Sequence, residues 1–223
     1  MSSLPKADLK LDWCSYEAAK WAVEHWHYSC TMPKSKLVKI GVWEDKAFVG
    51  VVLFGVGATA NLVKGYGLDK IQGCELVRVA LGNHITPTSK IVAIAIRILK
   101  RQAPGLRLIV SYADPEHSHV GVIYQAGGWV FSGMSQATDE YVYYGRRWQG
   151  RSFRHSHKGM EHFPGVTIVK GSSKYRYLYP LDSAMRAQIA PLAKPYPKRG
   201  PGETANAPET NRETGGSIPT GPL

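Results

Sequence analysis

The sequence has few cysteines and no long hydrophobic run. Its three cysteines are an odd number without paired spacing, which argues against a disulfide framework and for a reducing compartment. The first ten residues, MSSLPKADLK, lack the apolar core of a signal peptide. The most apolar stretch, KIVAIAIRILK at 90–100, is far too short to span a bilayer. We therefore expect a soluble cytoplasmic protein with no membrane partner, and the oligomeric state stays open.

Acidic side chains are also scarce. The chain of 223 residues has 17 Asp and Glu against 28 Lys and Arg, so the net charge is +11. This excess favours a polyanionic partner, nucleic acid before an anionic membrane surface. With 43% hydrophobic residues the chain can bury one full core. Large apolar residues nearly disappear from residue 189 onward, so we expect a domain over residues 1–188 and a disordered Pro/Gly-rich tail over 189–223.

Hydrophobic periodicity predicts a domain of the α+β or α/β class. The expected helices are 15–27 (capped by Ser15), 89–104 (capped by Ser89) and 119–129, and the expected strands are 37–44, 47–57, 74–81, 107–114, 129–134, 140–148 and 167–180. A strand, a crossover helix and a further strand imply parallel pairing. We therefore expect a mixed central sheet with flanking helices.

Two loops follow neighbouring strands of this sheet, where ligands commonly bind: LGNHITPTSK (81–90) and SYADPEHSH (111–119). Asp114 ends its strand and suits a general base or an orienting group, although it equally suits the cap of the next helix. Tyr124, on that helix, has a phenol suited to proton donation or hydrogen bonding, with an ordinary core tyrosine as the alternative. The start of the helix after 81–90 suits a phosphate, without the glycines of a known phosphate loop.

Several histidines occur in pairs two residues apart. His117 and His119 lie near two carboxylates, a composition suited to a metal, and His25 with His27 shows the same spacing. None has the spacing of a specific metal motif, so solvated or DNA-facing histidines are the alternative. If a metal is bound, Fe(II) held by His and carboxylate fits this composition best.

Arginines alternate with aromatics in YVYYGRRWQGRSFRHSHKG, residues 141–159. This pattern is typical of a surface that contacts phosphates and stacks on bases, while a basic strand pair with ordinary aromatic packing is the alternative. A second basic turn, PKSK, follows the histidine-rich segment HWHYS. The DNA-binding candidates are Lys34, Lys36, Arg146, Arg147, Arg151 and Arg154.

An ordered set of motifs resembles a known family. HWHYS before a proline turn, KIGVWEDKAFVGVVLFG, ELVRVAL, LIVSYAD and GVIYQAGGW are together similar to the bacteriophage Mom DNA-modification proteins, relatives of the GNAT acyltransferases, over about residues 10–180. The resemblance implies a GNAT-like fold. It also implies a transferase in the host cytoplasm that places a carbamoylmethyl (acetamido) group on N6 of adenine in double-stranded DNA and so protects phage DNA from restriction.

The same resemblance implies the site residues. The catalytic candidates that it carries over are His27, Tyr28, Arg78, Asp114 and Tyr124, with Ser29, Glu75 and Ser111 as second choices. His27 is implied as an acid–base partner or, with iron, as a ligand alongside His117 and His119.

The small-molecule acyl donor is less defined. GNAT enzymes hold coenzyme A with a glycine-bearing loop, and GNHITPTSK stands in its place here. Acetyl-CoA is therefore one candidate among others, and we expect the donor near Ser89, Lys90 and Ser111. Two other functions stay open: an ordinary GNAT N-acetyltransferase acting on a protein or small amine, and a DNA-binding protein without catalysis.

Overall fold

The computed structural model describes residues 7–57 and 61–198, apart from the side chains of residues 149 and 151; the predicted tail beyond residue 198 lies outside this range. The elements are β1 (Leu9–Trp13), α1 (Tyr16–Trp26), β2 (Leu37–Glu44), β3 (Ala47–Gly55), η1 (Lys64–Tyr66), β4 (Gly73–Leu81), α2 (Thr88–Gln102), β5 (Leu108–Ala113), η2 (Pro115–His117), α3 (Val122–Ala126), β6 (Val130–Met134), β7 (Asp139–Tyr143), β8 (Arg146–Gln149), α4 (Gly150–Ser156), β9 (Val166–Lys170), β10 (Tyr175–Pro180), α5 (Ser183–Ile189) and η3 (Ala190–Leu192).

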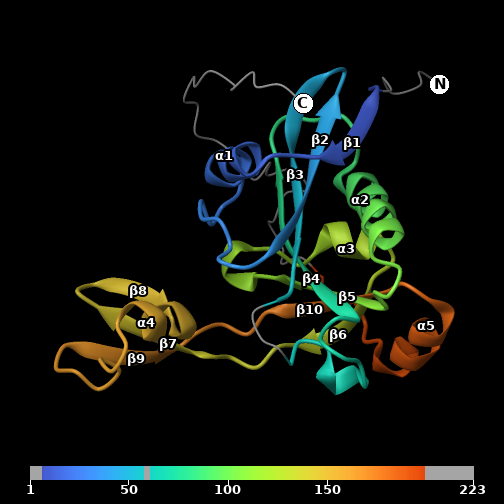
Figure 1. Ribbon diagram of the computed structural model, residues 1–223. Coiled ribbons are helices and arrows are strands. Elements are labelled where there is room, and N and C mark those ends of the chain that lie inside the picture. Colours follow the sequence, from blue (N-terminus) through green and yellow to red (C-terminus); the bar gives the residue numbers. More distant parts are fainter. Residues whose placement is uncertain (1–6, 58–60, 199–223) are drawn as a thin grey trace.

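The strands form two sheets. The larger has the order β1-β2-β3-β4-β5-β10-β6, and the smaller has the order β8-β7-β9. Within the described residues β4 and β5 pair in parallel, whereas the other paired strands are antiparallel, so the predicted mixed sheet with helices is confirmed. The smaller sheet and α4 form a lobe, residues 139–170, that stands beside the main sheet in Figure 1.

Alternating side chains on β3 build two layers over the main sheet. Val51 and Leu53 face α1, whereas Val52 and Phe54 face the core cluster that contains the buried side of α2. This follows from the two-residue period of a strand. The Ser15 side chain accepts a hydrogen bond from the backbone N–H of residue 18, which confirms the predicted cap of α1.

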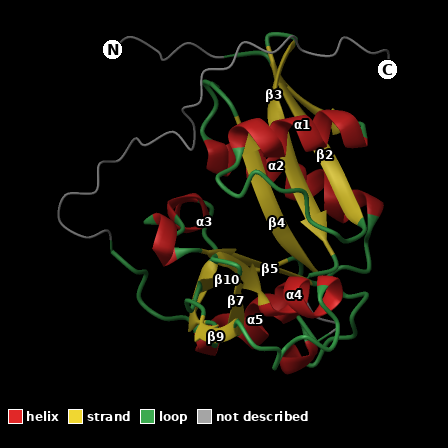
Figure 2. Ribbon diagram, turned by 90° about the vertical axis from the view of Figure 1, so that its left-hand side faces the viewer, coloured by secondary structure: helices red, strands yellow, loops and turns green. Residues whose placement is uncertain are grey.

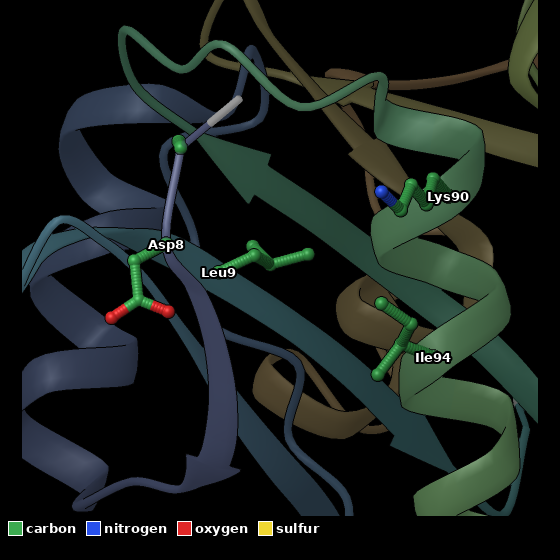
Figure 3. A pocket seen from close by; sticks show the side chains of 5 residues that line it. Asp8, Leu9, Lys90 and Ile94 are labelled. Carbon is green, nitrogen blue, oxygen red and sulfur yellow. The ribbon is translucent and has the colours of Figure 1, made fainter. Parts of the chain in front are cut away.

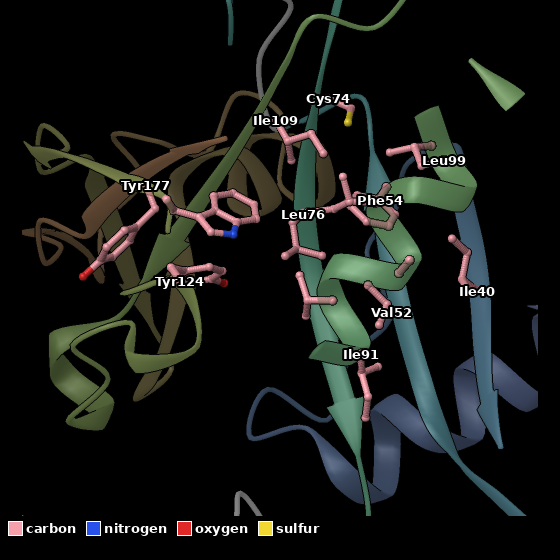
Figure 4. Packing of buried hydrophobic residues seen from close by; sticks show 14 of the residues in the cluster. Ile40, Val52, Phe54, Cys74, Leu76, Ile91, Leu99, Ile109, Tyr124 and Tyr177 are labelled. Carbon is pink, nitrogen blue, oxygen red and sulfur yellow. The ribbon is translucent and has the colours of Figure 1, made fainter. Parts of the chain in front are cut away.

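The same alternation continues on β5. Leu108 and Val110 pack in a cluster with Met185 of α5, and Ile109 packs in the larger core. In Figure 4 the aromatic part of that core, with Tyr124, lies to one side of Ile109, and the aliphatic part around α2 lies on the other. The larger core around Ile109 and the cluster around Met185 thus cover opposite faces of β5, the strand that leads into the candidate site.

Several predicted elements differ in detail. Helix α2 begins at Thr88 after an N-cap at Pro87, so Ser89 lies inside the helix and the prediction that it caps α2 was wrong. The predicted helix 119–129 is only the single turn α3, because Gly121 before it has a φ of 74° and Gly127–Gly128 follow it. The run 167–180 is not one element, since β9 belongs to the small sheet and β10 to the main one. Strand β1 was not predicted at all.

The folded chain continues past residue 188. The backbone N–H of Lys194 donates to the carbonyl of Phe131 at 2.8 Å, and the Tyr196 hydroxyl donates to the carbonyl of Trp129 at 2.6 Å. Residues 189–198, which the sequence assigns to the tail, therefore pack along β6. None of the helices that the structure describes is both long and apolar enough to cross a bilayer.

Candidate active site

The site lies where β4 and β5 separate. Their parallel pairing ends at Leu76 and Ser111. On its other side β4 pairs with β3 through a shifted register, in which Leu53 opposes Arg78 but the next residue opposes Leu76, so Val77 is an extra, bulged residue. Figure 2 shows the two groups of strands diverging above and below this point. Arg78 on β4 and Asp114 at the end of β5 lie beyond the separation.

Ser111 and Tyr124 form the floor of this opening. The Ser111 hydroxyl is fully buried and lies 2.8 Å from both the Leu76 carbonyl oxygen and the Tyr124 hydroxyl. A carbonyl only accepts, and serine has one proton to donate. The arrangement that satisfies both contacts has Ser111 donating to Leu76 and accepting from Tyr124. The Tyr124 proton thus points toward Ser111, and its ring packs in the core against Trp129 and Tyr177.

An aromatic cluster stands at the mouth of the opening. The Tyr28 ring lies 4.3 Å from His27, 4.3 Å from His117 and 5.3 Å from His119, measured between ring centroids. Tyr28 is 40% exposed and His117 is exposed, so the outer surface of this cluster is open to a ligand. The structure therefore brings the end of α1 next to the loop after β5, so that Tyr28 contacts His117 and His119.

His27 is neutral in this setting. It is 6% exposed, and burial, followed by the charges of Arg78, His119 and His117, lowers its pKa to about 3. Its Nδ1 accepts the backbone N–H of Ser29 at 3.1 Å and contacts the Ser29 hydroxyl at 2.8 Å. Because Nδ1 accepts, the ring proton is on Nε2. His27 is therefore a neutral hydrogen-bond donor, not a charged acid, at physiological pH.

Arg78 has an unused donor. One terminal nitrogen donates to the Val77 carbonyl at 2.8 Å, which holds the half-buried guanidinium against its own strand. The Nε–H is buried and has no acceptor among the described residues. A buried donor without a partner is costly, so an acceptor oxygen of a ligand would stabilise this position.

Asp114 is held at both carboxylate oxygens. Oδ2 lies 2.8 Å from the Lys174 ammonium, and Oδ1 accepts the backbone N–H of Glu116 at 3.1 Å. Burial raises the pKa of Asp114, but Lys174 and the backbone N–H outweigh it, so the pKa lies below its usual range. Asp114 caps the turn η2, not a helix beginning at His119. This carboxylate orients the loop that carries the two histidines, and it remains ionised.

The loop before α2 already holds a carboxylate. The Glu44 carboxylate already accepts the N–H groups of Ile85 at 2.6 Å and Thr86 at 2.7 Å. A second anion there would have to displace it. Lys90 is exposed and lines a surface depression with Asp8 and residues 7, 9 and 94, between β1 and α2 (Figure 3). Ser89 is half-buried on α2.

The histidines do not fit a metal ion. Across the described residues, no three His, Cys, Asp or Glu side chains come together in a way that could hold one. The Nε2 of His27 carries its proton and so presents no lone pair there. We therefore derive no step through iron.

The basic side chains have different surroundings. The Arg146 guanidinium lies 4.2 Å from the Trp148 ring centroid, and Arg154 donates to the Tyr141 hydroxyl at 3.2 Å. Arg147 is paired with Glu140 and lies 4.0 Å from Glu116. Lys34 and Lys36 are exposed in the loop between α1 and β2, Glu75 is half-buried on β4, and the side chain of Arg151 lies outside the described residues.

Sequence reasoning missed Lys174 and Glu44. Lys174 lies in a glycine- and serine-rich link, 60 residues from Asp114, and only the pairing of β10 with β5 brings the two together. Glu44 is the one acidic residue of the strand LVKIGVWE, and that was the one available signal.

Two comparisons with known proteins bear on the chain. A model described as the Mom protein family matches residues 8–198, which includes the catalytic candidates named above. The chain is also similar to the "Methylcarbamoylase mom" of Escherichia phage Mu, with 24% identity over 135 residues. The match covers 59% of this chain and 56% of that relative, so it spans little more than half the length of either.

Proposed function

The chain belongs to the Mom protein family, and on that premise we propose that it is a transferase that places a carbamoylmethyl group on N6 of adenine in double-stranded DNA. The observation that carries the proposal is the Arg78 Nε–H, buried without an acceptor beside the neutral His27 at the opening between β4 and β5. Two donors there suit the carbonyl oxygen of a transferred amide. In a phage infection, the modified adenine would protect the DNA from host restriction enzymes.

Adenine must leave the base stack to reach this opening. Turning one base out of a duplex costs a few kcal/mol, which contacts in the pocket must offset. The partly exposed Tyr28 ring, flanked by His117 and His119, offers such a contact by stacking. The net charge of +11 supplies attraction to the phosphate backbone without sequence preference.

The reaction transfers a two-carbon group, a methylene that carries a primary amide. The N6 lone pair forms a bond to the methylene carbon of a carbamoylmethyl donor, the bond from that carbon to the leaving group breaks, and N6 loses a proton. The N6 nitrogen becomes far more acidic as the new bond forms, so a carboxylate of lowered pKa such as Asp114 suffices as the acceptor. Lys174 keeps that carboxylate ionised and oriented.

The remaining side chains orient the donor and the leaving group. Arg78 Nε–H and His27 Nε2–H hold the amide oxygen of the donor, and Tyr28 donates a proton to the leaving group. Tyr124, whose proton is directed to Ser111, fixes the floor. The donor class is a small molecule that already carries the amide nitrogen, because an acetyl group alone does not supply it.

Nucleoside mass spectrometry on plasmid DNA from expressing cells tests the residue roles. We expect the modified fraction of adenine to fall about 10²–10⁴-fold with Arg78→Gln and with Asp114→Asn, the range typical of acid–base and orienting groups. Arg97→Gln, at an exposed position on α2, is the matched control and should modify DNA as wild type does. Equal modification by Arg78→Gln and its control would contradict the site.

The same experiment separates the alternatives. An ordinary acetyltransferase would leave DNA unmodified and produce acetylated amines, and a protein that only binds DNA would change neither. Either result from a folded wild-type protein would overturn the proposed function.

A further inference from the structure

The hairpin of β7 and β8 ends in a tight turn of unusual sequence. Tyr143 pairs with Arg146, so the turn has two central residues, Tyr144 and Gly145, with φ of 47° and 71°. Two successive positive φ values define a type I′ turn, which strongly favours Asn-Gly because a side chain with a bulky Cβ substituent is strained there. Of the non-glycine residues at positive φ in the described chain, Tyr144 is the one aromatic.

The Tyr144 side chain projects into solvent. It is 88% exposed, the highest value among the large hydrophobic side chains of the described residues. Its ring touches that of Tyr143, at 4.4 Å between centroids, but packs in no core cluster. The strand pair beneath it is firmly held, because the Tyr141 ring stacks on the buried Phe153 of α4 at 4.5 Å. A rigid hairpin thus presents a strained, exposed aromatic ring at its tip.

The lobe that carries this tip contacts the loop at the candidate active site. Arg147, three residues after Tyr144, lies 4.0 Å from Glu116 of η2, whose neighbour His117 contacts Tyr28. Three residues span at most roughly 10 Å, so the backbone of the tip lies within that distance of the backbone of Arg147. Figure 1 shows the lobe beside the main sheet, and a duplex that lies across both would meet the tip as well as the mouth of the opening.

We propose that Tyr144 inserts into the DNA duplex and takes the place of the adenine that turns out toward the site. The inference rests on the proposed function and adds the residue that opens the stack. Proteins that unstack base steps use an exposed wedge side chain beside phosphate-binding charge. The lobe has that charge: residues 139–170 contain six Lys and Arg against three Asp and Glu, and Arg146 directly follows the turn. This excess selects duplex DNA as the partner of the tip over a second copy of this basic chain.

Removal of the ring without damage to the turn tests the inference. Tyr144→Asn places a residue that the turn prefers, so the hairpin should fold at least as well, and Tyr144→Trp keeps a large ring as the matched control. Wild type and both variants are bound, at equal occupancy measured by gel shift, to a mixed-sequence duplex of several hundred base pairs. Permanganate then oxidises thymines that have lost their stacked partner. This readout needs no donor and no knowledge of the target sequence.

We expect wild type and Tyr144→Trp to create permanganate-reactive thymines, and Tyr144→Asn to create about tenfold fewer, since the wedge offsets the cost of unstacking. Modified adenine in plasmid DNA from expressing cells should fall in parallel.

If Tyr144→Asn matches wild type in both measurements while wild type modifies DNA, the wedge is refuted and the proposed function stands. If wild type modifies no DNA, both fail. If Tyr144→Asn instead changes the oligomeric state by light scattering and leaves thymine reactivity as in wild type, the ring serves contact between copies and the inference is overturned.

Discussion

The most exacting prediction concerns the charge of His27. Its pKa of about 3 in the folded protein compares with 6.5 for an ordinary histidine. Above pH 6.5 the ring is neutral in both states, and it contributes no pH dependence. As the pH falls below 6.5, His27 binds a proton in the unfolded chain, whereas in the folded protein it stays neutral until about pH 3. The free energy of unfolding therefore decreases over this window, by about 1.4 kcal/mol at pH 5.5 and about 2.7 kcal/mol at pH 4.5 from this group alone.

His27→Asn isolates that contribution. The asparagine oxygen takes the place of Nδ1 and can still accept the Ser29 N–H, but the side chain cannot bind a proton. Urea unfolding followed by fluorescence between pH 7.5 and 4.5 should give a variant that is less stable than wild type at neutral pH and loses stability more slowly on acidification. The difference between the two curves should change by about 2.7 kcal/mol over this range. A parallel curve for His27→Asn would refute the neutral, buried histidine.

Two further predictions concern hydrogen bonds that shape the site. Glu44→Gln removes the charge from the hydrogen bonds to the N–H groups before α2, and it should lower the free energy of unfolding in urea by about 1.5–3 kcal/mol. The control Glu24→Gln, in an exposed ion pair, should lower it by less than about 0.5 kcal/mol. Equal effects of the two changes would mean that the hydrogen bonds of Glu44 are not formed. Ser111→Ala and Tyr124→Phe remove the two sides of one bond. Their double-mutant cycle should show a coupling of about 0.5–1.5 kcal/mol, and additive effects would show that the hydroxyls do not interact.

The sequence predicts the main elements because their patterns are local. The period of SYEAAKWAVEHW, with its serine cap, and the alternation along AFVGVVLFG depend on neighbouring residues, and both elements occur as expected. Strand β1 was missed because Leu9–Trp13 is short and sits at the sheet edge: its sequence LKLDW alternates apolar and polar residues, but over only five positions. The 167–180 run contains the polar link KGSSK, a local break that the prediction of one strand passed over, and the topology of the two sheets divides the run there between β9 and β10.

The candidate site is only partly accessible from the sequence. His27, Arg78 and Asp114 are named by motif, but whether each is charged depends on partners distant in the chain. Lys174 keeps Asp114 ionised and Arg78 helps keep His27 neutral, and neither relation has a periodic signature.

The arginines of the lobe are visible as a pattern in the sequence, but the structure changes what the pattern implies. Their spacing predicts a phosphate-binding surface, but Arg147 is already paired with acids, and the prediction for DNA binding stays with the exposed members such as Arg146.

The central claim is that this site modifies adenine in DNA. The most direct measurement is tandem mass spectrometry of nucleosides from plasmid DNA of cells that express the wild-type chain, beside cells with the empty vector. We expect a deoxyadenosine that is heavier by one carbamoylmethyl group, with the added mass retained on the base fragment, in the expressing cells alone. Unmodified deoxyadenosine in both samples, with folded protein present, would contradict it.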